Sequence, residues 1–174
     1  MAIFKIVNEN YTGYKDMRNV IRYIGQPEKA CFKYAPGLFM TSEDYTDDIY
    51  TQMYGIKKTY GKDGGKQLAH FIVSFSSFEF DDESHITPAQ LDDVCSLTAY
   101  CLFLDGYQCF YAIHNTSHLH VHFLFNTVNW DNGMKFPGKR RDYKQIIDLF
   151  RELLYTVCKP DWYIPFKVYY GSQE

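Results

Sequence analysis

Residues 107 to 129 read YQCFYAIHNTSHLHVHFLFNTVN and carry four of the six histidines in the 174-residue chain. Two runs rich in apolar and aromatic residues flank a turn near residues 115 to 117, which predicts a β-hairpin. His118, His120 and His122 are spaced two residues apart, so in an extended strand their side chains leave the same face. Such a face can aim several neutral imidazoles at one point, and a divalent metal or a phosphate is the usual occupant. The alternative to such a site is a strand whose histidines are structural core residues with hydrogen-bond partners.

The rest of the chain predicts further strands and helices around this hairpin. Strands, marked by β-branched and aromatic residues, are expected at residues 2–7, 67–80 and 166–170. Helices, marked by apolar spacing or by cap signals, are expected at about 14–24, 41–60, 87–104 and 143–157. Residues 29–41 are expected to be irregular. This mixture predicts an α+β domain with a central, largely antiparallel sheet of about five strands, flanked by helices on one or both faces.

The composition indicates one folded domain. At 174 residues, with 46% hydrophobic and 18% aromatic residues, the chain can bury a substantial core but is short for two domains. The five cysteines are scattered and form no CxxC pair, which fits a reduced compartment. No apolar run reaches the roughly 18 residues of a membrane span, and the N-terminus lacks an export signal. We therefore expect a cytoplasmic protein without membrane insertion.

A basic segment follows the hairpin. Residues 135–144, KFPGKRRDYK, hold five Lys or Arg against one Asp, although the formal net charge of the chain is −3. Such a segment could contact the phosphates of a nucleic acid, and it could equally be an ordinary solvated loop. The residues alone leave the two interpretations open.

Several segments, in the right order, resemble the relaxases of conjugative plasmids and integrative elements, which are HUH-superfamily mobilisation nucleases, especially their MobP class. The third motif of that family is similar to His114, then HVH at 120–122, then Asn126. The nucleophilic tyrosine of the family, which lies at a helix end near the N-terminus, is similar to Tyr23 in RYIGQPEKA. Weaker similarities are HFIVSF at 70–75 and TPAQLDD at 87–93, so the resemblance covers about residues 2 to 150.

The resemblance implies an HUH-nuclease fold and a metal-assisted DNA-nicking reaction. Tyr23 would attack one strand at a transfer origin, form a 5′-phosphotyrosyl intermediate and later allow the strand to be rejoined. The expected cofactor is a divalent metal, Mg²⁺ or Mn²⁺, bound by His114, His120 and His122. Three neutral imidazoles would not reduce the positive charge of such a cation, and they would leave coordination positions open for phosphate oxygens.

One departure from the family pattern concerns the third metal ligand. The family usually has an Asp two residues after the first His, where this chain has Thr116. His118 therefore competes with His114 as the third ligand, and we favour His114. His118 and His70 are also candidates to activate the Tyr23 hydroxyl, which at its ordinary pKa near 10 is a poor nucleophile.

The implied partner is DNA with a hairpin and an adjoining single strand, and accessory proteins of the relaxosome are further expected partners. The expected phosphate contacts are basic residues near the tyrosine and after the hairpin: Arg22, Lys135, Lys139, Arg140 and Arg141. Residues 1–174 would form a single relaxase domain, which we expect to be the N-terminal part of a longer protein.

Three alternatives stay open on the sequence. HLHVHFL at 118–124 also fits the pattern of histidine-triad nucleotide hydrolases, with His120 as nucleophile and no metal. A replication-initiator nuclease of the same superfamily would use a tyrosine after the histidines, for which Tyr143 is the candidate, although Ile146 stands where such helices usually have Lys. The third alternative applies if Tyr23 is a core residue: the protein would then be a metal-stabilised DNA-binding module without enzymatic activity.

Overall fold

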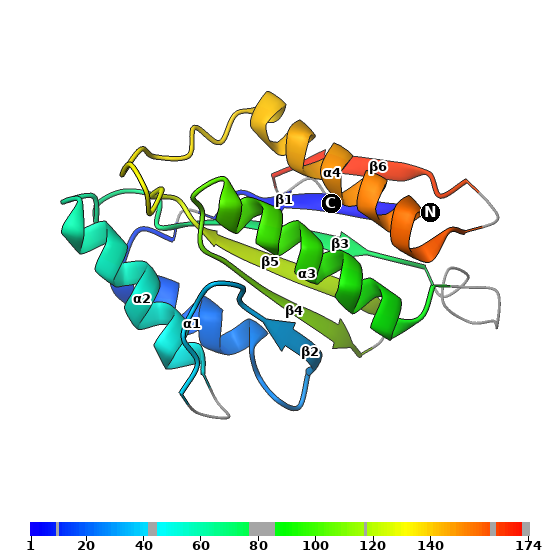
Figure 1. Ribbon diagram of the computed structural model, residues 1–174, viewed down its shortest axis with the longest axis horizontal. Coiled ribbons are helices and arrows are strands. Elements are labelled where there is room, and N and C mark those ends of the chain that lie inside the picture. The colour runs from blue at the N-terminus through cyan, green and yellow to red at the C-terminus, as the bar shows by residue number, and fades with distance from the viewer. Residues whose placement is uncertain (10, 42–44, 77–85, 117, 161–162, 172–174) are drawn as a thin grey trace.

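The computed structural model describes residues 1–174 except for 10, 42–44, 77–85, 117, 161–162 and 172–174 (Figure 1). The described strands are β1 (Ala2–Val7), β2 (Ala30–Tyr34), β3 (Leu68–Ser74), β4 (Cys109–Asn115), β5 (Leu119–Asn126) and β6 (Phe166–Tyr170). The described helices are α1 (Tyr14–Ile24), α2 (Thr46–Thr59), α3 (Pro88–Leu104) and α4 (Arg140–Cys158). The six strands form one sheet in the order β2-β4-β5-β3-β1-β6. Neighbouring strands run antiparallel except β1 and β6, which are parallel.

The α+β class and the largely antiparallel sheet are confirmed, with one strand more than expected. Residues 29–41 were expected to be irregular, but Ala30–Tyr34 forms the edge strand β2. It pairs with β4 from Ala30 opposite His114 to Tyr34 opposite Tyr111, with an irregularity between Ala30 and Phe32. β2 has only five residues, is half-exposed, and shows no clear apolar alternation in its sequence.

The other comparisons between expected and observed elements concern where α2 and α3 begin and where β3 ends. α2 begins at Thr46 rather than near residue 41, because Asp48 in its first turn accepts hydrogen bonds from the amide and hydroxyl of Thr41 and holds that residue outside the helix. α3 begins as expected, with the Thr87 side chain accepting a hydrogen bond from the Gln90 amide. The expected strand at 67–80 ends at Ser74, and residues 77–80 of it lie outside the described residues.

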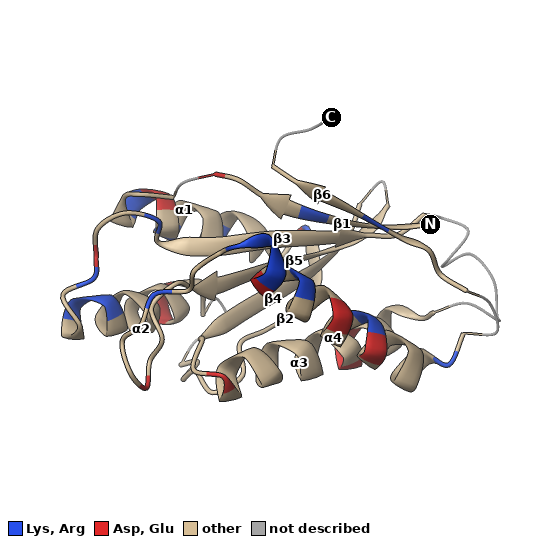
Figure 2. Cartoon of the chain, turned by 90° about the horizontal axis from the view of Figure 1, so that it is seen from above, with Lys and Arg blue, Asp and Glu red and all other residues tan. Residues whose placement is uncertain are grey.

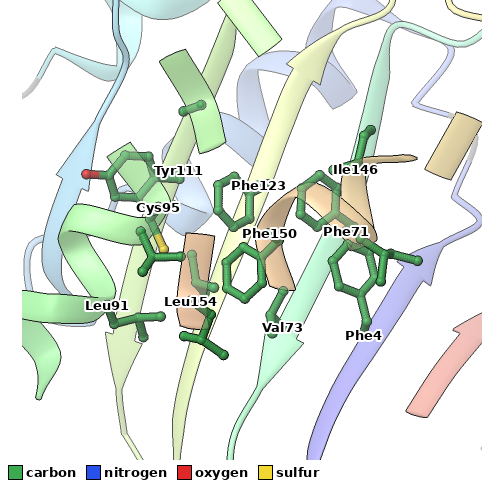
Figure 3. Close-up of a cluster of buried hydrophobic side chains, with 14 of the residues drawn as sticks. Phe4, Phe71, Val73, Leu91, Cys95, Tyr111, Phe123, Ile146, Phe150 and Leu154 are labelled. Atoms are coloured by element: carbon green, nitrogen blue, oxygen red, sulfur yellow. The ribbon is translucent and has the colours of Figure 1, made fainter. Parts of the chain in front are cut away.

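Helices lie on both faces of the sheet. Figure 2 shows α3 and α4 on one side and α1 on the other, and α2 shares a buried cluster with α1. The larger core lies under α3 and α4, where Phe71 stacks on Phe4 and Phe123 with ring centroids 4.8 and 4.6 Å apart (Figure 3). Phe150 of α4 closes this aromatic row by packing edge-on against Phe123.

Strand alternation places the histidines on the α1 side. Val121 and Phe123 of β5 belong to the core under α3 and α4, whereas Leu124 belongs to the cluster under α1 and α2. His120 and His122 share the face of Leu124, because side chains two residues apart in a strand leave the same side. The histidine end of the sheet therefore faces the C-terminal end of α1.

Candidate active site

Three histidines from two neighbouring strands converge at this end of the sheet. His114 in β4 lies directly opposite His120 in β5, and His122 follows two residues later. Their candidate ligand atoms all lie within 4.8 Å of one another, a separation that one metal ion can bridge. His118 lies outside this group, which favours His114 as the third ligand.

Hydrogen bonds to carbonyl groups orient two of the three imidazoles. His114 donates from Nε2 to the carbonyl oxygen of Ile24 at 2.7 Å, and His120 donates from Nδ1 to the carbonyl oxygen of His118 at 3.0 Å. A carbonyl oxygen can only accept, so the bonding nitrogen carries the proton and the other ring nitrogen keeps its lone pair. Each ring is thereby held in a tautomer that can bind a metal.

The electrostatics of the cluster favour neutral imidazoles. Burial lowers the pKa of His114, His120 and His122, and the neighbouring histidines lower the pKa of His122 further, to about 2. The three rings are therefore uncharged at neutral pH, which is the form that binds metals. An all-imidazole set fits a divalent cation, and imidazole binds Mn²⁺, Co²⁺, Ni²⁺ and Zn²⁺ more readily than Mg²⁺.

Tyr23 lies in the same hollow as the histidines. It occupies the last turn of α1, where the residue is 53% exposed, so it is not a core residue. Together with His118, His120 and His122 it lines a cavity of about 660 Å³, and with His70 it lines an adjoining cavity of about 650 Å³. The structure thus brings the candidate nucleophile and two of the three metal-ligand candidates, His120 and His122, to one groove.

Two lysines near the site were not anticipated. The Nζ of Lys29 lies 4.0 Å from the ring centroid of Tyr23, where the cation contacts the face of the ring. Lys5 lines both cavities beside Tyr23. The sequence does hold a signal for Lys5, since it alternates with the buried Phe4 and Ile6 and must leave the opposite face of β1. Lys29 follows the helix and has no such signal.

The expected DNA contacts are not gathered at this groove. Arg22 and Arg18 both make paired hydrogen bonds to the carboxylate of Asp47, at 2.7 to 3.1 Å. Lys135 donates a hydrogen bond to the carbonyl oxygen of Gly64 at 2.5 Å. The structure therefore gives Arg22 and Lys135 partners within the protein.

The remaining basic residues lie at the N-terminal end of α4. Lys139 is the residue before the helix, and Arg140 and Arg141 are its first two residues (Figure 2). Because α4 covers the face opposite the histidines and follows the far end of β5, this segment lies away from the groove. Arg140 contacts the ring of Tyr170 in β6, with 5.1 Å from guanidinium carbon to ring centroid.

Asn126, at the end of the histidine motif, has a structural role in this fold. Its side chain is buried and donates hydrogen bonds to the carbonyl oxygen of Met53 in α2 and to the side chain of Gln108. It thereby joins the far end of β5 to α2 and to the start of β4. Thr116, which stands where the family usually has an Asp, is exposed in the turn between β4 and β5.

The other candidate nucleophiles do not fit the site. Tyr143 is 4% exposed and packs on Phe136 in the core under α4, with the sheet between it and the histidines. The replication-initiator interpretation, which needs Tyr143 as nucleophile, is therefore wrong. Tyr11 is also buried and contacts His70, whereas Tyr14 is exposed in the first turn of α1.

Comparison with known families agrees with this geometry. Residues 23–156 match the model of the family described as relaxase, MobA/VirD2-like, nuclease domain. The match begins at Tyr23 and includes all three histidines of the cluster. No match was found among curated proteins. Within the described residues, no helix is both long and apolar enough to cross a membrane. The match spans most of the chain, and the protein therefore belongs to the MobA/VirD2-like relaxases of the HUH superfamily.

Proposed function

We propose that this relaxase nicks one DNA strand at a transfer origin through attack of the Tyr23 hydroxyl on the scissile phosphate. The observation that carries the proposal is that Tyr23 lines one groove with His120 and His122, two members of the three-histidine cluster. A bond forms between the phenolic oxygen and phosphorus, and the bond from phosphorus to the 3′ oxygen breaks. The products are a 5′-phosphotyrosyl ester and a free 3′-hydroxyl, and the ester conserves the energy needed to rejoin the strand.

His114, His120 and His122 would hold a divalent metal, and we propose Mg²⁺ or Mn²⁺. When bound, such a cation supplies a Lewis acid for the phosphate oxygens. The residues themselves contribute orientation, because the carbonyl of Ile24 that accepts the hydrogen bond of His114 belongs to the residue next to Tyr23. The nucleophile and the phosphate-binding end of the groove are thereby held together.

The Tyr23 proton needs an acceptor, and the groove offers one candidate. His118 lines the same cavity as Tyr23, so we propose it as the base. His70 is less suited, because both of its ring nitrogens already have hydrogen-bond partners. Lys29, over the face of the Tyr23 ring, would stabilise the developing phenolate.

DNA with a hairpin and an adjoining single strand is the proposed substrate, and accessory relaxosome proteins are proposed partners. Lys5 and Lys29 lie where phosphates near the groove would pass. Arg22, Lys135, Lys139, Arg140 and Arg141 are proposed to contact phosphates outside it. The protein would act in the cytoplasm as a single domain over residues 1–174.

The ends of the cleaved strand test the reaction. The protein is incubated with Mn²⁺ and supercoiled plasmid carrying the transfer origin of its own element. We expect nicked plasmid with a free 3′-hydroxyl and a 5′ end blocked by protein. Nicks with free 5′-phosphates would instead indicate water as nucleophile and would contradict the transesterification.

A further inference from the structure

A buried chain of side chains leads away from His122 into the protein. Nδ1 of His122 lies 3.0 Å from Nε2 of His70, and Nδ1 of His70 lies 2.8 Å from the hydroxyl of Tyr11. Glu9 lines the same cavity as Tyr11 and His70, and its charge contributes to raising the pKa of the Tyr11 hydroxyl. His122, His70 and Tyr11 are each less than 10% exposed, whereas Glu9 lies at the surface. The chain thus leads from a metal-ligand candidate through two other side chains toward the Glu9 carboxylate.

The position of each proton in this chain of side chains can be assigned by starting from Glu9. The negative charge of the nearby Glu9 attracts the Tyr11 hydroxyl proton, so the phenol oxygen is left to accept the Nδ1 proton of His70. Burial and Glu9 raise the pKa of Tyr11, which keeps this proton on the phenol. Nε2 of His70 then accepts the Nδ1 proton of His122. The lone pair of His122 is left on Nε2.

We propose that Glu9, Tyr11 and His70 are positioning residues that fix His122 in the tautomer able to bind a divalent cation. Metal-binding imidazoles commonly donate their second nitrogen to a carboxylate or a carbonyl. His114 and His120 use backbone carbonyls for this, so side-chain changes leave their orientation in place. His122 alone among the three depends on side chains. The inference rests on the proposed metal site.

Removal of the Tyr11 hydroxyl tests this role while keeping the ring. Binding of Mn²⁺ alone is measured by isothermal titration calorimetry for the wild type, Tyr11→Phe and Glu9→Gln. We expect Kd to rise on the order of 10- to 100-fold in Tyr11→Phe, and in the same direction in Glu9→Gln. The matched control is Tyr111→Phe, which loses a buried hydroxyl that donates to Asp92 at 2.7 Å on the other face of the sheet. Its Kd should stay within about twofold of the wild type, since it leaves the chain to His122 intact.

A His120→Ala variant separates the failure of this inference from the failure of the metal site. If the wild type does not bind Mn²⁺, or binds it as well as His120→Ala does, the metal site is wrong and the inference falls with it. If the wild type binds and His120→Ala does not, but Tyr11→Phe binds like the wild type, only the positioning role is overturned.

Imidazole nitrogen chemical shifts give a readout that needs no metal and no activity. In metal-free wild-type protein, His122 should carry its proton on Nδ1 alone. In Glu9→Gln, the negative charge that attracts the Tyr11 proton is lost, so the direction of the chain is no longer fixed and His122 should show a mixture of tautomers. Because Glu9 lies at the surface, the tautomer can still be measured in Glu9→Gln if Tyr11→Phe does not fold. An unchanged Nδ1–H tautomer in Glu9→Gln would contradict the proposal.

Discussion

Nε2 of His114 lies 2.7 Å from the carbonyl oxygen of Ile24, so a metal-ligand candidate in β4 is joined to the end of the helix that carries Tyr23. Ile24 is the last residue of α1, and Gly25 follows it. A side chain at Gly25 would meet the Thr46 side chain at 2.5 Å, so α1 can end this close to α2 only with glycine there. The C-terminal end of α1 and the metal-ligand candidate His114 are thus held in a fixed position relative to each other.

The first prediction is that His114→Ala loosens the last turn of α1. The lost hydrogen bond contributes about 1 kcal/mol, and it is the contact that ties the Ile24 carbonyl to the sheet. Amide hydrogen exchange in metal-free protein should become faster in that turn. His120→Ala is the control, since it removes another histidine of the cluster without touching α1. Equal protection of the turn in the two variants would show that His114 does not hold the helix.

The second prediction is that His120→Ala loses DNA nicking while the fold is kept. His120 is half-buried, bonds through Nδ1 to the carbonyl oxygen of His118 and is not part of either hydrophobic cluster, so truncation leaves the core intact. The nicking rate should fall on the order of 100-fold or more, because stabilisation of charge on the phosphate accounts for several kcal/mol of the barrier. The melting temperature and the nicking rate are measured on the same preparation. Nicking at the wild-type rate in chelator-treated buffer would refute the metal assignment.

The third prediction concerns the basic segment after the hairpin. A variant with alanine at positions 135, 139, 140 and 141 should bind origin DNA more weakly and with a flatter salt dependence. Each phosphate contact with duplex DNA contributes a slope of about 0.9 in log affinity against log salt. Lys5→Ala serves as the comparison, because Lys5 lies in the groove on the other face. An unchanged slope in the fourfold variant would remove the segment from the interface.

The fourth prediction is that stability rises with pH because of Lys57. This lysine is fully buried, and its ammonium donates to the carbonyl oxygen of Gln67 at 2.6 Å, with no carboxylate partner among the hydrogen bonds of the described residues. Burial, with a smaller effect from Lys135, lowers its pKa to about 7. Below pH 7 both the folded and the unfolded chain carry this proton. Between pH 7 and about 10, the unfolded chain binds it more tightly, so the free energy of unfolding increases.

Urea denaturation at pH 7 and pH 9 checks the sign. The contribution of Lys57 should add about 2 kcal/mol of stability over that range, since one pKa unit corresponds to about 1.4 kcal/mol. In Lys57→Met this gain should be absent, and the comparison of the two proteins cancels the other groups that titrate. The same increase in both would assign it to a different residue.

Much of this architecture can be predicted from the sequence because its signals are local. The β4–β5 hairpin follows from two apolar runs around a short turn, and α3 follows from its Thr87-Pro88 start. β2 could not be predicted, because this half-exposed strand of five residues shows no apolar alternation, whereas the other edge strand, β6, was expected from its aromatic and β-branched residues. The convergence of the histidines on Tyr23 was expected only from the family resemblance, since it depends on how α1 crosses the sheet.

The hydrogen-bonded chain that leads from His122 through His70 to Tyr11 could not be predicted from the sequence for a similar reason. His70 and Tyr11 are far from the hairpin along the chain, and only the pairing of β3 with β5 brings His70 beside His122. The placement of residues 135–141 likewise follows from α4 crossing to the opposite face. A charge pattern indicates what a segment can bind, but the face on which it lies is set by tertiary packing.

The identity of the nucleophile is the central claim, and peptide mapping of the covalent adduct tests it most directly. Single-stranded oligonucleotide carrying the nicking site is incubated with the wild type, Tyr23→Phe and Tyr14→Phe, and tryptic peptides are then examined by mass spectrometry. Tyr14 is the matched control because it is an exposed tyrosine on the same helix. We predict a DNA-linked peptide containing Tyr23 in the wild type and in Tyr14→Phe, and no adduct in Tyr23→Phe. An adduct that persists in Tyr23→Phe, or that maps to another tyrosine or to His120, would contradict the account.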